Sequence, residues 1–123
     1  LIGWSSTKIG VDIERKDRQF QAHKLSKRFF TQDENCEIEN LTPSQAKEVI
    51  LKRWVVKEAA IKWQRGKIST NLDQWTWENN SSFAYNKRLG YKVKIYKQNY
   101  DKWTYAIALN EDSIIPKPIL CIN

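Results

Sequence analysis

The chain has 123 residues, of which 41% are hydrophobic and 12% aromatic. This composition excludes an intrinsically disordered chain and predicts one globular domain with a single core. No apolar run reaches the ~20 residues that a membrane-spanning helix needs, so we expect no membrane association. The net charge of +7 predicts an acidic partner, such as a phosphorylated cofactor, a nucleic acid, an anionic lipid surface or an acidic protein.

The chain begins with Leu1 and contains no methionine. Because translation starts at methionine, we expect the chain to be a piece of a longer protein. No basic leader followed by an apolar stretch is visible, so no signal peptide is predicted. The two cysteines, Cys36 and Cys121, lie far apart without CxxC spacing, which favours reduced thiols and a cytoplasmic location.

Two short strands are predicted at the start of the chain. LIGWS at 1–5 is apolar, and IGVDIE at 9–14 alternates between apolar and polar side chains, as a half-buried strand does. Asp12 and Glu14 then share one face of the second strand, with their stems ~7 Å apart. Two like charges at this distance repel each other unless a cation lies between them.

Two shorter helices are predicted next. Residues 20–30 carry apolar side chains at helical spacing, with a basic face formed by Lys24, Lys27 and Arg28. Thr31 and Glu34 form a capping-box pattern, which predicts a helix over residues 32–40.

The longest predicted element is a helix from Thr42 to Gly66. Thr42 and Gln45 form a second capping-box pattern, and Gly66 is a suitable end. Its apolar stripe is predicted to face the core and consists of Ala46, Val49, Ile50, Trp54, Ala60 and Ile61.

Glu58 falls within this apolar stripe, and its carboxylate allows two interpretations. It could pair with Lys62 one turn later on the same helix. Alternatively, it could be a metal ligand or a general base held against an apolar wall. If this helix covers the strand at 9–14, the carboxylates of Asp12, Glu14 and Glu58 could together hold a hard cation such as Mg²⁺.

The second half of the chain follows a period of two. Strands are predicted at 74–78, 82–85, 90–96 and 102–109, with a hairpin connection at 98–101. Pro116 and Pro118 make the tail an edge segment or an extended arm. The predicted fold class is α+β, an antiparallel sheet packed against one long helix.

Three stretches resemble the signature blocks of the 4′-phosphopantetheinyl transferase superfamily. They are IGVDIE at 9–14, KRFFTQDE at 27–34 and WVVKEAAIK at 54–62, and their order and separation also match. Later stretches, ISTNLDQW at 68–75 and WTYAIAL at 103–109, are similar as well. The joint occurrence of D-I-E with W-x-x-K-E-A-x-x-K is more specific than either block alone.

Within the superfamily, the D-I-E spacing and the tryptophan before KEA look like the larger, surfactin-synthetase-activating type. Enzymes of that type contain two similar halves with coenzyme A bound between them. The resemblance therefore implies that residues 1–123 form a single phosphopantetheinyl transferase domain that corresponds to the second half and lacks the N-terminal half. The family's His-Ser segment upstream of a stretch like LIGWS is missing, and the sole histidine, His23, is expected to be a surface residue.

The resemblance also implies a mechanism. The family transfers the 4′-phosphopantetheine arm of coenzyme A to a serine of an apo acyl or peptidyl carrier protein and releases 3′,5′-ADP. Asp12, Glu14 and Glu58 would hold Mg²⁺, or Mn²⁺, and Glu58 would accept the serine proton directly or through water. Lys62 would contact the pyrophosphate of coenzyme A, and Lys57 is a weaker candidate for that contact.

Other functions remain open from the sequence. A basic chain with many aromatic residues and a sheet could bind single-stranded nucleic acid, although none of the usual RNA-binding signatures is present. The chain could also be an inactive half-domain that lacks its partner half, or it could self-associate to rebuild a two-sided cleft. An acidic carrier protein would be expected to contact the basic face formed by Lys24, Lys27 and Arg28.

Overall fold

The computed structural model describes residues 1–114 and 117. In this part of the chain, the strands are β1 (Ile9–Arg15), β2 (Trp75–Thr76), β3 (Phe83–Asn86), β4 (Tyr91–Tyr100) and β5 (Trp103–Asn110). The helices are α1 (Ala22–Phe29), α2 (Gln32–Glu39), α3 (Pro43–Gln64) and α4 (Ile68–Asn71), followed by a 3₁₀ turn at Leu72–Gln74.

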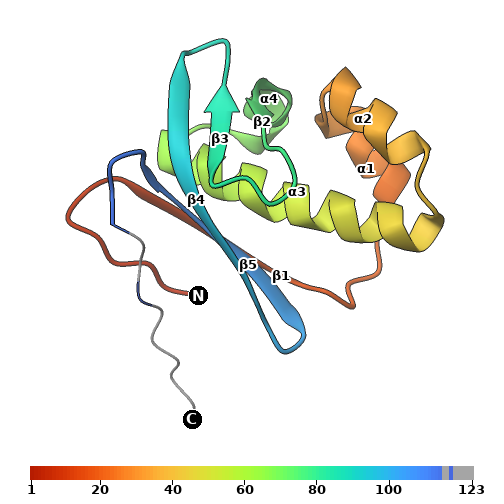
Figure 1. The fold of residues 1–123 in the computed structure, drawn as a ribbon, viewed down its shortest axis with the longest axis horizontal. Helices are drawn as coiled ribbons and strands as arrows, with labels where there is room; N and C mark the ends of the chain where they lie inside the picture. Colours follow the sequence, from red (N-terminus) through yellow and green to blue (C-terminus); the bar gives the residue numbers. More distant parts are fainter. Residues whose placement is uncertain (115–116, 118–123) are drawn as a thin grey trace.

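The five strands form one antiparallel sheet in the order β1-β5-β4-β3-β2. Helix α3 crosses one face of this sheet, and α1 and α2 lie beside the N-terminal half of α3 (Figure 1). The predicted α+β class is therefore confirmed. Among the described strands, the edge strand β1 pairs only with β5, in a register that places Asp12 opposite Ala106 and Glu14 opposite Thr104.

Helix α3 begins as its sequence predicts. The hydroxyl of Thr42 accepts a hydrogen bond from the backbone N–H of Gln45, and the Gln45 side chain accepts one from the N–H of Thr42. The helix ends at Gln64 rather than at Gly66, because Arg65 takes the left-handed conformation, with φ of 61°. A glycine usually occupies such a position, so a left-handed arginine could not be predicted here.

The buried surface of α3 extends beyond the predicted apolar stripe. Residues 53–61 are all buried, because the sheet covers one side of the helix while α1, α2 and the segment after Gly66 pack around the others. Val49, which was expected in the stripe, is only half-buried. The helix therefore passes through the core instead of lying on its surface.

Gly10 allows β1 to approach α3 closely. A Cβ atom at this position would lie 2.0 Å from the carbonyl oxygen of Ala59 and 2.4 Å from the backbone nitrogen of Trp63. Both of these are backbone atoms that cannot move aside easily. This close approach brings the strand residue Asp12 within reach of Glu58 and Lys62 on the helix.

Several element boundaries differ from those predicted. Residues 1–5 form no strand, although Gly3 does lie against β1, since a Cβ on Gly3 would lie 2.8 Å from the Val11 side chain. Strand β4 continues through the predicted connection at 98–101 as far as Tyr100, and the turn consists of Asp101 and Lys102. Most of the tail predicted as an edge segment, with Cys121, lies outside the described residues.

Within the described part of the chain, no helix combines the length and the apolar character needed to cross a membrane.

Candidate active site

Three carboxylates converge where β1 passes under α3. Asp12 and Glu14 project from the same face of β1, and Glu58 projects toward them from α3. One oxygen from each residue lies within 4.8 Å of the others. The structure thus brings together the three residues that the sequence suggested as metal ligands.

Asp12 and Glu58 are buried to a degree that is unusual for acids, with exposed fractions of 7% and 8%. Oδ1 of Asp12 accepts a hydrogen bond of 2.8 Å from Nζ of Lys62, while its Oδ2 is buried with no partner among the described residues. Nζ of Lys62 lies farther from Glu58, at 3.9 Å. The pairing of Glu58 with Lys62 predicted from helix spacing is therefore present but long, and the closer partner of Lys62 is Asp12.

The burial of Glu58 changes its acidity. Desolvation raises the pKa of Glu58 to about 8, and the neighbouring carboxylate of Asp12 acts in the same direction, while Lys62 opposes them. At neutral pH without a cation, this carboxyl group is therefore mostly protonated.

The surroundings of Lys62 favour its charged form, whereas those of Glu58 favour the neutral form. Burial alone would lower the pKa of its ammonium, but the hydrogen bond to Asp12 and the attraction of the three carboxylates raise it above the ordinary value. Half of this side chain is exposed, so its ammonium can also reach a ligand from solvent. The charge of Glu14 is neutralised separately by an ion pair of 2.9 Å with Arg18, a residue that was not predicted to belong to the site.

The donor set fits a hard divalent cation. All three side chains offer oxygen, with no histidine or cysteine among them, which suits Mg²⁺ or Mn²⁺ better than zinc. The unpartnered Oδ2 of Asp12 and the raised pKa of Glu58 both indicate a site with too much negative charge for one lysine to neutralise.

Lys57 does not join this group. Its side chain is fully buried, and its ammonium donates to a carboxylate oxygen of Glu34 and to the carbonyl of Leu72. Arg53 lies beside it, 3.7 Å from Glu34, and pairs with Glu37. Lys57 therefore fastens α2 to α3 and is not exposed to a ligand at the carboxylates.

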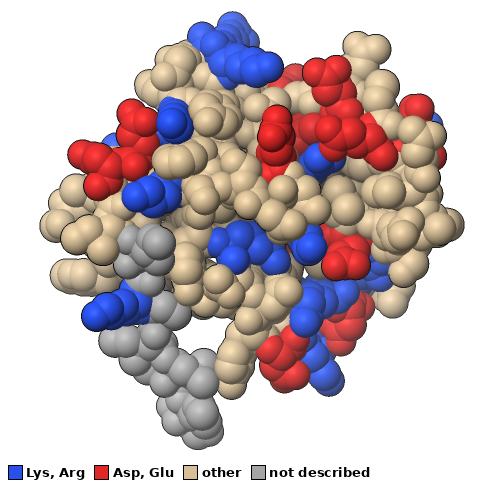
Figure 2. All heavy atoms as spheres, viewed as in Figure 1, with Lys and Arg blue, Asp and Glu red and all other residues tan. Residues whose placement is uncertain are grey.

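The predicted basic face on α1 is exposed. Lys24, Lys27 and Arg28 all point to solvent, while the other side of α1 packs on the core through Leu25 and Phe29. Figure 2 shows a contrasting acidic group at the upper right of one face, where Figure 1 places α2 with its four acidic residues.

The chain resembles known proteins in both sequence and fold. The sequence profile of the 4′-phosphopantetheinyl transferase superfamily matches residues 8–110. Among solved structures, the fold is similar to that of a holo-(acyl-carrier-protein) synthase from Bacillus anthracis in complex with CoA (3′,5′-ADP). The TM-score is 0.59 at 19% identity, and the match covers 83% of this chain and 93% of the synthase. No curated protein sequence matches the chain.

Proposed function

Because the chain belongs to the 4′-phosphopantetheinyl transferase superfamily, we propose that it transfers the phosphopantetheine arm of coenzyme A to a serine of an apo carrier protein. The observation that carries this proposal is the cluster of Asp12, Glu14 and Glu58, with Lys62 beside it. A carboxylate cluster next to a partly exposed lysine is suited to a substrate that carries a pyrophosphate, because a cation and an ammonium can share its charge.

Each residue has a definite role in the proposed reaction. Asp12, Glu14 and Glu58 would hold Mg²⁺, which when bound supplies positive charge against the pyrophosphate of coenzyme A. Lys62 keeps its proton, because its pKa is raised, and donates to a pyrophosphate oxygen. Lys57 is left out of this role because its buried ammonium already has two partners.

The chemistry is a displacement at phosphorus. The serine oxygen of the carrier protein forms a bond to the phosphorus that bears the pantetheine arm, and the bond from that phosphorus to the bridging oxygen breaks. The serine proton passes to a Glu58 carboxylate oxygen, directly or through water, and 3′,5′-ADP leaves with the bridging oxygen. Lys62 stabilises the charge that grows on the leaving phosphate.

We propose α1 as the surface that receives the carrier protein. Lys24, Lys27 and Arg28 give it a positive charge, and carrier proteins of this class are expected to be acidic. Attraction between opposite charges would speed the encounter and would weaken as salt is added.

We further propose that the chain works together with a second unit of the same fold, as the D-I-E spacing of the larger type suggests. This unit would be either an N-terminal half or a second copy of the chain. The face of β1 turned away from α3 supports the idea, because its apolar side chains Ile9, Val11 and Ile13 are only half-buried. A cleft for coenzyme A would then lie between the two units.

The intact mass of an apo acyl carrier protein, measured after incubation with this chain, coenzyme A and Mg²⁺, tests the function. We expect a gain of one phosphopantetheine that requires Mg²⁺ and is absent with Asp12→Ala. If the chain alone gives no gain, the measurement is repeated with the upstream coding region restored. Failure in that longer protein as well would refute the transferase activity.

A further inference from the structure

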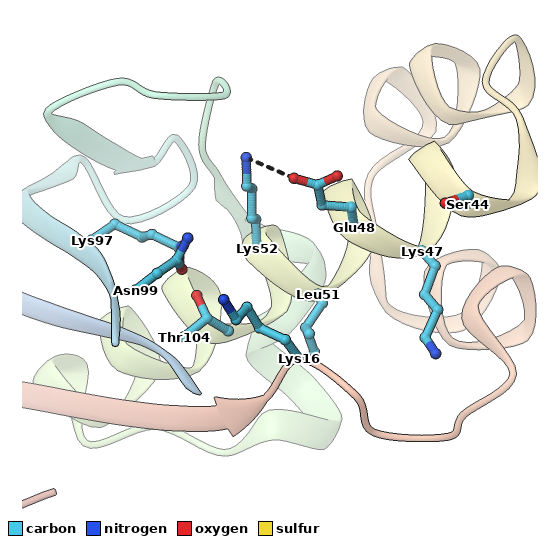
Figure 3. A pocket seen from close by; sticks show the side chains of 9 residues that line it. All are labelled: Lys16, Ser44, Lys47, Glu48, Leu51, Lys52, Lys97, Asn99 and Thr104. Atoms are coloured by element: carbon cyan, nitrogen blue, oxygen red, sulfur yellow. Dashed lines mark hydrogen bonds and ion pairs between the residues drawn. The ribbon is translucent and has the colours of Figure 1, made fainter. Parts of the chain in front are cut away.

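A second polar site lies on the same face of the sheet as the carboxylates. A cavity of about 350 Å³ opens between the first half of α3 and the ends of β1, β4 and β5 (Figure 3). Thr104 on β5 lines it, with Glu14 opposite Thr104 on one side and Asn99 on the other. Because neighbouring strands are ~4.8 Å apart, Asn99 lies roughly 10 Å from Glu14, so the cavity is close to the carboxylate cluster but separate from it.

Three lysines from three different elements reach into this cavity. Lys97 comes from β4, Lys52 from α3 and Lys16 from the residue that follows β1, whereas Lys47 at the rim points away from them (Figure 3). These positions are far apart in the sequence, so only the fold brings the three ammonium groups together.

The positive charge of these lysines is poorly neutralised. Lys52 pairs with Glu48 at 3.5 Å, but the Glu48 side chain is 70% exposed. In the described part of the chain, Lys16 and Lys97 form no ion pair, and Lys97 donates only to the neutral Oδ1 of Asn99, at 2.7 Å. Burial lowers the pKa of Lys97 to about 8, and repulsion from Lys52 and Lys16 adds to this effect.

Thr104 adds a buried hydroxyl to the same cavity. The residue is 2% exposed, and its Oγ1 has no hydrogen-bond partner among the described residues. A buried hydroxyl without a partner is unfavourable, so a ligand that accepts its hydrogen bond would offset part of that cost.

We propose that this cavity, here called the lysine pocket, binds a phosphate group of a small anionic ligand. Three ammonium groups and one hydroxyl supply donors from several directions, and the oxygens of a phosphate can accept from all of them. The volume is at the lower end of the range for small-molecule sites, which favours a small ligand over a protein segment. The pocket does not depend on the transferase activity, and only the identification of the ligand below refers to it.

Calorimetric titration with inorganic pyrophosphate, in EDTA to exclude cation binding at the carboxylates, tests the pocket. Thr104→Val keeps the shape and the charge but removes the hydroxyl, and we expect it to weaken pyrophosphate binding about tenfold. The double variant Lys52→Gln/Lys97→Gln should weaken it by at least about tenfold. The matched control Lys67→Gln/Lys87→Gln removes the same charge from exposed residues outside the pocket, and it should stay within about twofold of the wild type.

Equal pyrophosphate affinity in the wild type, Thr104→Val and the pocket double variant would overturn the proposal. So would an equal loss in the pocket variant and in the control, because that result shows general attraction to a basic surface. Circular dichroism verifies folding, and if the double variant does not fold, Thr104→Val decides alone.

The source of the phosphate is found by comparing coenzyme A with 3′-dephospho-coenzyme A. If the pocket takes the 3′-phosphate of coenzyme A, the pocket double variant loses affinity for coenzyme A but not for the dephospho form. If it takes a free phosphate compound, coenzyme A and pyrophosphate bind together without competition. Both results support a phosphate pocket, and neither requires a carrier protein, so failure of the transferase assay is recognised separately.

Discussion

At the scale of single residues, the raised pKa of Glu58 should make cation binding at the proposed site depend on pH. A cation needs the ionised carboxylate, yet burial and Asp12 raise the pKa of Glu58 to about 8 in the metal-free protein. We therefore expect Mg²⁺ affinity to rise between pH 6 and about 8 and to level off above, with release of a proton on binding. Calorimetry in buffers of different ionisation enthalpy measures that proton. Glu58→Gln should remove this part of the pH dependence, and an unchanged slope would show that another group titrates.

The same shift predicts how the metal-free protein responds to pH. In the unfolded chain Glu58 ionises near its ordinary pKa of 4.5, while in the folded chain it keeps its proton until about pH 8. The unfolded state therefore binds fewer protons in this window, so stability should fall as pH rises from about 5 to 8. Urea unfolding at several pH values in EDTA checks this, and the fall should be smaller in Glu58→Gln.

Lys62 offers a second test at this scale. Lys62→Met removes the ammonium that lies 2.8 Å from Asp12 and the proposed contact to pyrophosphate. We expect the rate of phosphopantetheine transfer to fall roughly 10²-fold, as when one charged donor is removed from a transition state. Lys62→Arg keeps the charge and should recover part of the rate. A rate close to wild type in Lys62→Met would exclude the lysine from the reaction.

At the scale of elements, the contact of β1 with α3 depends on Gly10. Gly10→Ala would place a Cβ 2.0 Å from the Ala59 carbonyl oxygen, so strand and helix must separate. We expect a loss of about 3 kcal/mol or more of unfolding free energy, with weaker Mg²⁺ binding. Gly90→Ala is the control, because Gly90 has open space around it but φ of 69°, and it should cost only about 1 kcal/mol. Similar losses in both variants would contradict the close contact.

The attachment of α2 to α3 depends on a buried charge. Lys57→Met would leave Glu34, which is 5% exposed, without the ammonium that it accepts from. A buried pair broken on one side typically costs about 3–5 kcal/mol, and we expect a loss of that order. Adding Glu34→Gln should restore part of the stability in a double-mutant cycle. If the losses of unfolding free energy from the two substitutions simply add, the two side chains do not interact.

The elements that could be predicted from the sequence are those determined by residues close together in the chain. The capping boxes at Thr31 and Thr42 and the alternation in β1 and β5 each depend on residues a few positions apart. The left-handed Arg65 was not predictable, because the usual glycine signal stands one residue later. The role of Lys57 was missed for a different reason, since its partner Glu34 lies 23 residues earlier in the chain and helix spacing says nothing of it.

At the scale of the whole molecule, the uneven charge should decide how a carrier protein docks. Lys24→Glu/Lys27→Glu reverses two charges on α1 and leaves the carboxylate cluster unchanged. We expect KM for the apo carrier protein to rise roughly tenfold, while KM for coenzyme A stays the same. Added salt should reduce the difference between the variant and the wild type. Equal changes in both KM values would place the carrier protein elsewhere.

The pairing of β1 with β5 has a further consequence. Side chains alternate along a strand, so sliding β1 by one residue would turn Asp12 and Glu14 to the far side of the sheet and bring Val11 and Ile13 beneath the helix. Only the correctly aligned strand can complete a cation site with Glu58. A bound cation would therefore stabilise the correct alignment over the shifted one, so the ion would select the register of the strand as well as fill the site.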